Sequence, residues 1–188
     1  MPLRKRGWIL VSDKSMRQRE EAKHIPIHSI GICSKRSPMQ REIEKKILAL
    51  LDQHRIMTIA TLRPDGWPQA TTVGYVSEGL TLYFLCGLDS QKAANLARDN
   101  RVSLTIDHDA AQIMEITGLS MAGRAEAVVD RAEAEKVLRM LPLKYPEQKA
   151  MPGPMPTAEQ VRIFRVVPIV ISVLDYSKGF GHTDLVTC

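Results

Sequence analysis

The stretch Ile56-Met57-Thr58-Ile59-Ala60-Thr61-Leu62 opens the region that decides the fold, which continues to His108. It is rich in β-branched residues and ends at the turn sequence Arg63-Pro64-Asp65-Gly66, so it predicts a strand followed by a tight turn. Two more strand-like runs follow, Pro68–Ser77 and Leu80–Leu85. Three antiparallel strands joined by tight turns form a meander, which usually closes into a barrel or a sandwich.

A short helix follows these strands and offers a site for an anion. Ser90-Gln91-Lys92 opens a helix predicted over Gln91–Arg98, with Asp89 or Ser90 as its N-cap. Free N–H groups and the positive end of the helix dipole lie at such a start, where a Ser hydroxyl and a Lys ammonium can join them. The plain alternative is an N-cap beside a solvated lysine, and spacing alone favours it. A fourth strand is predicted over Val102–Ile106.

The run Thr71-Thr72-Val73-Gly74 is the second candidate for a binding site. A flat ring system with donors and acceptors along its edge needs backbone partners in an extended row, which a strand supplies. Gly74 would let such a ring approach the main chain, because glycine has no Cβ. An ordinary strand with a glycine bulge explains the same residues, and is favoured when this run is taken by itself.

Two helices are predicted on either side of these candidates. Met39–Arg55 carries apolar residues at helical spacing, which predicts one buried stripe that packs across the barrel: Ile43, Ile47, Leu50 and Leu51. Asp130 is expected to cap a second helix that ends near Leu141. The segment Leu143–Thr157 contains four prolines and is expected to be a loop.

Two more strands complete the prediction of a six-stranded, mainly β fold with flanking helices. Ile113–Val129 has β character and contains Gly118 and Gly123, which suggest bulges or close backbone approach. Val161–Leu174 is apolar and β-branched, and Pro168 places it at an edge or at a bulge.

Bulk properties favour one ordinary cytoplasmic domain. A chain of 188 residues can bury a proper core, and no apolar run approaches the roughly 20 residues that cross a bilayer. The N-terminal apolar run Trp8–Val11 is too short for a signal-peptide core. The three cysteines, Cys33, Cys86 and Cys188, lack metal-like spacing and are expected to be reduced thiols.

The net charge of +5 is confined to the leading segment. Residues 1–38 hold 9 Lys/Arg against 3 Asp/Glu, whereas the rest of the chain holds 17 against 18. A basic body face for nucleic acid is therefore unsupported. We expect residues 1–38 to be a disordered extension or an over-long start, 39–174 to be the domain, and 175–188 to be a tail. His24, His28 and Cys33 fit no metal motif.

The order of these parts resembles the FMN-binding split-barrel family typified by pyridoxamine 5′-phosphate oxidase. The resemblance covers roughly Glu42 to Glu126 and rests on an ordered set of short pieces: Ile59-Ala60-Thr61, Asp65-Gly66-Trp67-Pro68, Leu82-Tyr83-Phe84, Ser90-Gln91-Lys92-Ala93, Asn95-Leu96 and Asn100-Arg101-Val102-Ser103-Leu104. It implies a six-stranded antiparallel split β-barrel and a homodimer with FMN in clefts between the subunits. It also implies that Ser90 and Lys92 bind the FMN phosphate, and that the strand from Thr71 to Val76 lies along the flavin.

Departures from the vitamin B6 oxidases argue against pyridoxamine phosphate as the substrate. Those enzymes carry an Arg and a Lys where this chain has Thr71 and Val76, and an Arg where it has Gln91. Their C-terminal substrate motif with Arg and His has no counterpart here. The resemblance therefore implies an FMN-dependent oxidoreductase with an unknown substrate and NADPH or NADH as a possible electron donor.

The tail Asp175–Asp184 looks like the ending of a subset of split-barrel flavoproteins. One interpretation is a lid in which Phe180 and His182 reach the flavin, across the dimer; the alternative is a solvent-exposed tail. Three other functions stay open: a non-catalytic flavin carrier or sensor, a split barrel that uses haem, and one that uses the deazaflavin F420. His54 and His108 are expected to be surface histidines, and Cys86 a core thiol.

Overall fold

The computed structural model describes residues 38–150 and 156–188. Its three α-helices are α1 (Pro38–Gln53), α2 (Gln91–Arg98) and α3 (Arg131–Lys144). Three 3-10 turns, η1 (Ile113–Glu115), η2 (Pro146–Ala150) and η3 (Tyr176–Lys178), lie between the larger elements. The predictions for residues 1–37, with His24, His28 and Cys33, fall outside the described residues. None of the described helices is long and apolar enough to cross a bilayer.

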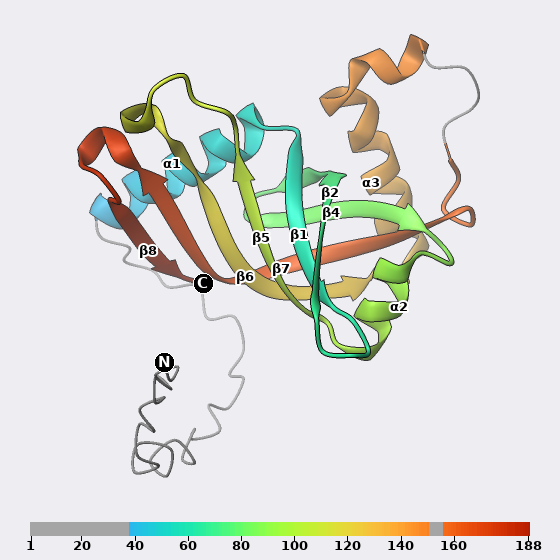
Figure 1. The fold of residues 1–188 in the computed structure, drawn as a ribbon. Coiled ribbons are helices and arrows are strands. Elements are labelled where there is room, and N and C mark those ends of the chain that lie inside the picture. Colours follow the sequence, from blue (N-terminus) through green and yellow to red (C-terminus); the bar gives the residue numbers. More distant parts are fainter. Residues whose placement is uncertain (1–37, 151–155) are drawn as a thin grey trace, which may run out of the picture. The chain divides into compact units, whose positions relative to one another are not determined.

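Within these residues, eight strands form one antiparallel sheet that curls into a half-open barrel (Figure 1). The order of the path is β2-β1-β5-β6-β7-β4-β3, and β8 pairs with β7. Their bounds are β1 Ile56–Leu62, β2 Pro68–Gly74, β3 Val76–Glu78, β4 Thr81–Gly87, β5 Arg101–Asp107, β6 Thr117–Ala127, β7 Val161–Asp175 and β8 Thr183–Thr187. The predicted mainly β split barrel is confirmed, with eight strands rather than six.

The predicted three-stranded meander is wrong, because the second run divides at Tyr75. Its first part, β2, pairs with β1, while its second part, β3, pairs with β4. These two strands end the path of the sheet, yet one residue joins them, so the sheet must curl until its edges meet. Tyr75 is fully buried at this join and donates its hydroxyl to Leu51 O at 2.9 Å.

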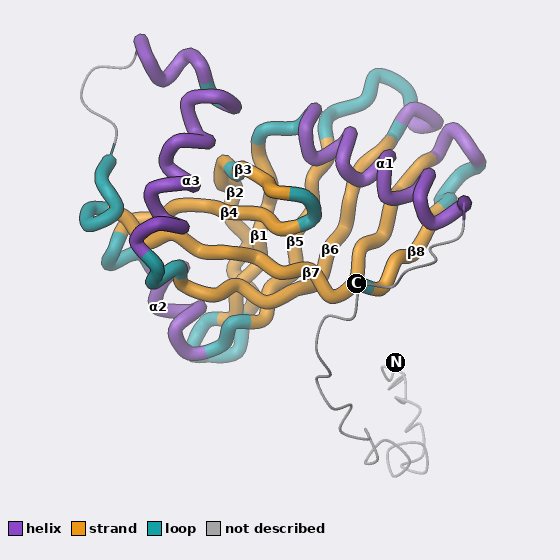
Figure 2. The backbone as a smooth tube through the Cα atoms, turned by 180° about the vertical axis from the view of Figure 1, so that it is seen from behind, coloured by secondary structure: helices purple, strands orange, loops and turns teal. Residues whose placement is uncertain are grey.

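Strand alternation decides which residues form the core. Val102, Leu104 and Ile106 of β5 are buried while their neighbours are exposed, as the period of two predicts. Ile47, Leu50 and Leu51 of α1 pack into the same core, so the predicted stripe and its place across the barrel are confirmed. Figure 2 shows α1 lying across one face of the sheet.

The expected backbone irregularities occur in the hairpin of β6 and β7. The register shifts between Ala122 and Gly123, where Gly123 pairs with Pro168 and Ile169 is left over. A Cβ on Gly123 would lie 2.5 Å from Val167 O, and one on Gly118 would lie 2.8 Å from Ile106 O. Both glycines therefore permit close backbone approach.

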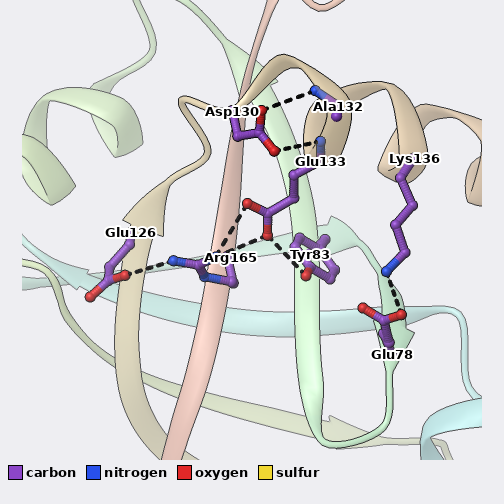
Figure 3. Close-up of polar contacts among 8 residues, drawn as sticks. All are labelled: Glu78, Tyr83, Glu126, Asp130, Ala132, Glu133, Lys136 and Arg165. Atoms are coloured by element: carbon purple, nitrogen blue, oxygen red, sulfur yellow. Dashed lines mark hydrogen bonds and ion pairs between the residues drawn. The ribbon is translucent and has the colours of Figure 1, made fainter.

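Polar contacts fasten the start of α3 to the sheet (Figure 3). Asp130 caps the helix by accepting hydrogen bonds from the N–H groups of Ala132 and Glu133, both at 3.3 Å. The Glu133 carboxylate accepts bonds from Arg165 of β7 at 3.0 Å and from the Tyr83 hydroxyl of β4 at 3.1 Å. The pKa of Tyr83 is raised to about 12, mainly by burial and secondly by the hydrogen bond to Glu133.

The C-terminal tail adds a strand that the sequence analysis did not predict. Its last part, β8, pairs with residues Val170–Leu174 of β7. Before β8, the buried Asp175 forms an ion pair with Lys46 of α1 and accepts a bond from Ser177 Oγ at 2.6 Å. A loop with positive φ at Gly179 and Gly181 then turns the chain back.

Candidate functional site

Ser90 begins α2 and is the predicted anion-binding residue that the structure places best. Its backbone is extended, and its Oγ accepts a hydrogen bond from Ala93 N at 3.2 Å. This is the N-cap arrangement, which leaves the hydroxyl hydrogen of Ser90 available to a ligand oxygen. The end of the helix dipole adds a partial positive charge at the same place.

A cavity of about 400 Å³ lies beside this helix start. Its walls come from the end of β4, from α2, from the end of β6 and from the start of β7, and are lined by Leu88, Asp89, Ser90, Ala93, Ala94, Ala97, Ala127, Arg162 and Phe164. The volume falls within the range of small-molecule sites, roughly 300–1,000 Å³. Most of the lining is apolar, with Ser90 and two charged groups as the polar exceptions.

Arg162 is the site residue that the sequence analysis missed. It is the second residue of β7 and pairs with Cys86 of β4, which brings it to the cavity wall. The sequence carried no signal for this, because Arg162 lies about 70 residues from Ser90 and has no motif around it. Only the pairing of β7 with β4, whose end leads into α2, brings the two together.

Gln91 and Lys92 do not line the cavity. Residues 90, 93, 94 and 97 form the cavity side of α2, so Lys92 lies on another side of the helix, with Asn95 and Leu96 three and four residues on. No described residue forms an ion pair or a side-chain hydrogen bond with Lys92. Its ammonium is thus available to a ligand, but from a different direction than the guanidinium of Arg162.

A buried polar network joins α2 to β2, and so connects the two predicted parts of the site. Gln91 Nε2 donates to Asn95 Oδ1 at 2.9 Å, and Asn95 Nδ2 donates to Thr61 Oγ1 at 2.9 Å and Gln69 Oε1 at 3.2 Å. Asn95 is fully buried. Because buried amides need partners, this network fixes the helix start against the strand that carries Thr71–Gly74.

The predicted strand run divides between the two faces of β2. Thr71 pairs with the buried Ile59, shares its face, and has a buried Oγ1 without a hydrogen-bond partner among the described residues. Val73 packs against the core, whereas Thr72 is exposed. An orphaned buried hydroxyl is unusual, and it marks Thr71 as a group that a ligand could satisfy.

Gly74 has a structural reason that the sequence analysis did not anticipate. A Cβ at this position would lie 2.9 Å from the hydroxyl of Tyr145, the residue after α3. That hydroxyl accepts a bond from Tyr75 N at 2.8 Å, and it lies within bonding distance of the carbonyl oxygens of Tyr75 and Arg55. In this structure the side chain of Tyr145 occupies the space above Gly74.

His182 lies far from the cavity within one chain. Its Nε2 is 3.3 Å from Asp184 Oδ1 at the start of β8. Asp175 N donates to His182 O, so His182 lies level with the end of β7, whereas the cavity lies at residues 162–164. At about 3.3 Å per residue, the two sites are separated by roughly 35–45 Å along the strand. A contact between His182 and a ligand at Ser90 therefore requires a second subunit.

The prediction of two surface histidines is wrong for His54, which is only 9% exposed. Its ring stacks on His108 with centroids 5.1 Å apart, and its buried Nε2 has no partner among the described residues. Burial lowers the pKa of His54, and the nearby charge of His108 lowers it further. Burial also lowers the pKa of Lys144 to about 8. Cys86, as expected, packs partly buried against the core.

The residues present fit a ligand that combines an anion with an aromatic body. The Ser90 hydroxyl, the N–H groups of α2 and two cations, which no described residue pairs, can meet an anion. Thr71 of β2 has an unpartnered Oγ1, and the polar network of Asn95 joins α2 to β1 and β2. In the part of the chain that the structure describes, no three His, Cys, Asp or Glu side chains gather as metal ligands.

Comparisons with known proteins give relatives of this fold. General stress protein 26 of Bacillus subtilis is 23% identical over 104 residues, which cover 53% of this chain and 74% of that protein. A conserved hypothetical protein from Mycobacterium tuberculosis is 28% identical with a TM-score of 0.62, covering 75% of this chain and 90% of that one.

Two structures of haem proteins share the fold at lower identity. HutZ, the haem storage protein of Vibrio cholerae, is 19% identical with a TM-score of 0.55, covering 66% of this chain and 89% of that one. A haem-binding protein of Mycobacterium smegmatis is 21% identical with a TM-score of 0.60, covering 81% of this chain and 60% of that one.

The family model described as pyridoxamine 5′-phosphate oxidase matches residues 43–170. This match runs from α1 into β7, and so includes β2, the start of α2 and Arg162. With the split barrel, it shows that the chain belongs to the pyridoxamine 5′-phosphate oxidase family.

Proposed function

We propose that this protein binds FMN and is an FMN-dependent oxidoreductase with a substrate other than pyridoxamine phosphate. The observation that carries the proposal is the capped start of α2. Ser90 caps the helix beside a cavity of suitable size, and a buried network ties the helix start to β2. Bound FMN would supply the hydride or electron chemistry, while the protein binds and orients it.

The residues of this chain have separate roles in the proposal. Ser90 and the first N–H groups of α2 hold the phosphate, and Lys92 neutralises part of its charge. Thr71 offers its unpartnered hydroxyl to the flavin from one face of β2, Thr72 offers its hydroxyl on the opposite face, and the backbone of β2 runs beside the ring. Gly74 contacts the ring only where Tyr145 moves aside, because the Tyr145 hydroxyl covers that glycine.

We also propose a homodimer, supported by an uncharged band of two register rows across the outer face of the sheet. One register row crosses five strands through small polar side chains that are exposed or half-buried: Thr72, Thr58, Thr105, Ser120 and Ser172. The next row contains Ala70, Ala60, Ser103, Ala122 and Val170. Interface cores are depleted of charged residues, and this face has none in either row.

In a twofold dimer through this face whose axis runs across the strands, the far end of each chain lies over its partner. This is the arrangement in which Phe180 and His182 of one subunit can cover the flavin of the other. Phe180 is 74% exposed on its loop, so an aromatic ring is available for such a contact. Light scattering should give a dimer for the wild type and a monomer for Thr105→Arg, which places a charge within the face.

The first experiment is the visible spectrum of the purified protein, followed by release and mass identification of the cofactor. Yellow flavin bands and an FMN mass support the proposal, and Lys92→Ala should weaken FMN binding. Reduction of the bound flavin by NADPH or NADH, with turnover of an electron acceptor, separates an enzyme from a flavin carrier. A colourless dimer that does not bind added FMN would contradict the proposal.

Haem is the second candidate ligand, because HutZ and the Mycobacterium smegmatis protein are named for haem. Imidazole is a common axial ligand of haem iron, and His182 is an imidazole on the tail. The same spectrum decides between the candidates, since haem gives a Soret band and F420 gives deazaflavin fluorescence. A Soret band that is lost in the His182→Ala variant would identify haem, and not flavin, as the ligand.

A further inference from the structure

The cavity beside α2 contains two opposite charges on otherwise apolar walls. Arg162 and Asp89 both line it, together with Leu88, Phe164 and four alanines. Their side chains form no ion pair with each other, nor with any other described residue. Ser90 contributes the remaining polar group.

Arg162 differs in this respect from most arginines of the described region. Arg165 binds Glu126 and Glu133, Arg101 binds Asp99, and Arg131 binds Glu135. A guanidinium presents a planar set of donors that matches a carboxylate or a phosphate, and it gains most where part of its surroundings is apolar. Arg162 is exposed, lies beside the apolar lining of the cavity and has no anionic partner among residues 38–150 and 156–188.

We propose that this cavity binds an organic anion with an aromatic or apolar body, and that Arg162 holds its anionic group, joined by Ser90 where the ligand is FMN. The Phe164 ring and the alanines of α2 contact the body of the ligand. Two sources of such a ligand exist. One is the phosphate end of the proposed FMN, in which case the inference rests on the proposed function; the other is a separate anionic substrate.

Asp89 allows a test of whether the ligand of the cavity is negatively charged. Its carboxylate lies on the same wall and repels an anion, so Asp89→Asn should strengthen binding. Arg162→Gln should weaken it, because a charge-assisted bond is lost. A general loss of folding cannot move two variants in opposite directions. Arg124→Gln is the matched control, since Arg124 is exposed on β6, binds Asn100 Oδ1 and does not line the cavity.

The experiment titrates full-length wild type and the three variants with two kinds of probe. Anilinonaphthalene sulfonate is an aromatic anion whose fluorescence reports binding, and FMN and riboflavin differ only in the phosphate. Arg162→Gln should weaken binding of an anionic probe by roughly five- to tenfold, in line with one partly exposed charged bond. Asp89→Asn should strengthen it by about two- to threefold, and both effects should shrink as salt increases.

The pattern of losses identifies the source. If Arg162→Gln weakens FMN but not riboflavin, the cavity holds the flavin phosphate. If it weakens the sulfonate while FMN binding is unchanged or absent, the cavity takes a separate anion; absent FMN binding would then contradict the proposed function alone. The inference is overturned if Arg162→Gln matches Arg124→Gln with every probe, or if the wild type binds none of them.

Discussion

Gly74 allows a direct test of what its missing side chain is for. The structure attributes the glycine to the Tyr145 hydroxyl, which would lie 2.9 Å from an added Cβ. The alternative reason, close approach of a flavin ring, involves no Tyr145. Gly74→Ala in the wild type and in a Tyr145→Phe background therefore separates the two explanations.

The size of the effect follows from two opposing contributions. Overpacking against a side chain held by hydrogen bonds costs about 1–3 kcal/mol. Replacing a glycine by alanine in a strand returns about 0.4–1 kcal/mol through the unfolded state. Gly74→Ala should therefore lower the free energy of unfolding by about 1–2 kcal/mol. In the Tyr145→Phe background the nearest atom is the ring carbon at 3.3 Å, which no hydroxyl holds in place, so the cost should fall close to zero.

The assay is urea unfolding of the cofactor-free protein, followed by circular dichroism, for both single variants and the double variant. The coupling free energy between the two positions should be about 1–2 kcal/mol. Gly87→Ala is the control, because a Cβ there meets nothing within 4 Å, and it should raise the free energy of unfolding by about 0.4–1 kcal/mol. An equal cost of Gly74→Ala in both backgrounds would refute the contact as the reason for the glycine.

Three further predictions concern charge and the tail. Burial and the charge of His108 lower the pKa of His54, so the unfolded chain binds more protons than the folded one near this pKa. The free energy of unfolding should therefore fall as the pH drops through 6.5. In urea unfolding at a series of pH values, His54→Gln should flatten this dependence. Glu133→Gln removes the negative charge and one of the two carboxylate oxygens shared by Arg165 and Tyr83, and should cost about 1–2 kcal/mol in the same assay. Glu135→Gln, which loses only an exposed pair, should cost under about 0.5 kcal/mol. His182→Ala should lower flavin affinity and turnover in the dimer. Unchanged values would contradict the hypothesis that the tail is a lid over the flavin.

Local periodicity and capping were enough to predict most elements. The helix Gln91–Arg98 has the predicted bounds, and Ser90 is its cap. β1 also has its predicted bounds, Ile56–Leu62. These features depend on residues a few positions apart, so a single sequence contains their cause. The bulge at Gly123 and Pro168 was predictable for the same reason, since each residue carries its own backbone restriction.

Features that depend on distant pairing could not be predicted in this way. The run 68–77 is uniformly strand-like, and it divides at Tyr75 because its two ends find different partners, β1 and β4. The tail is polar and rich in turn residues, yet β8 forms because β7 is long enough to offer an edge beyond β4. Strand identity is local, but strand partnership is not.

The candidate site shows the same division. The sequence by itself determined a mainly β chain, a capped helix start at Ser90 with Lys92, and a strand at Thr71–Gly74. Only the tertiary structure decided that Arg162 shares a cavity with Ser90, that Tyr145 covers Gly74, and that His182 is remote within one chain. The physical reason is that caps and periodicity act within a few residues, whereas a cavity is made where the curled sheet brings separate segments together.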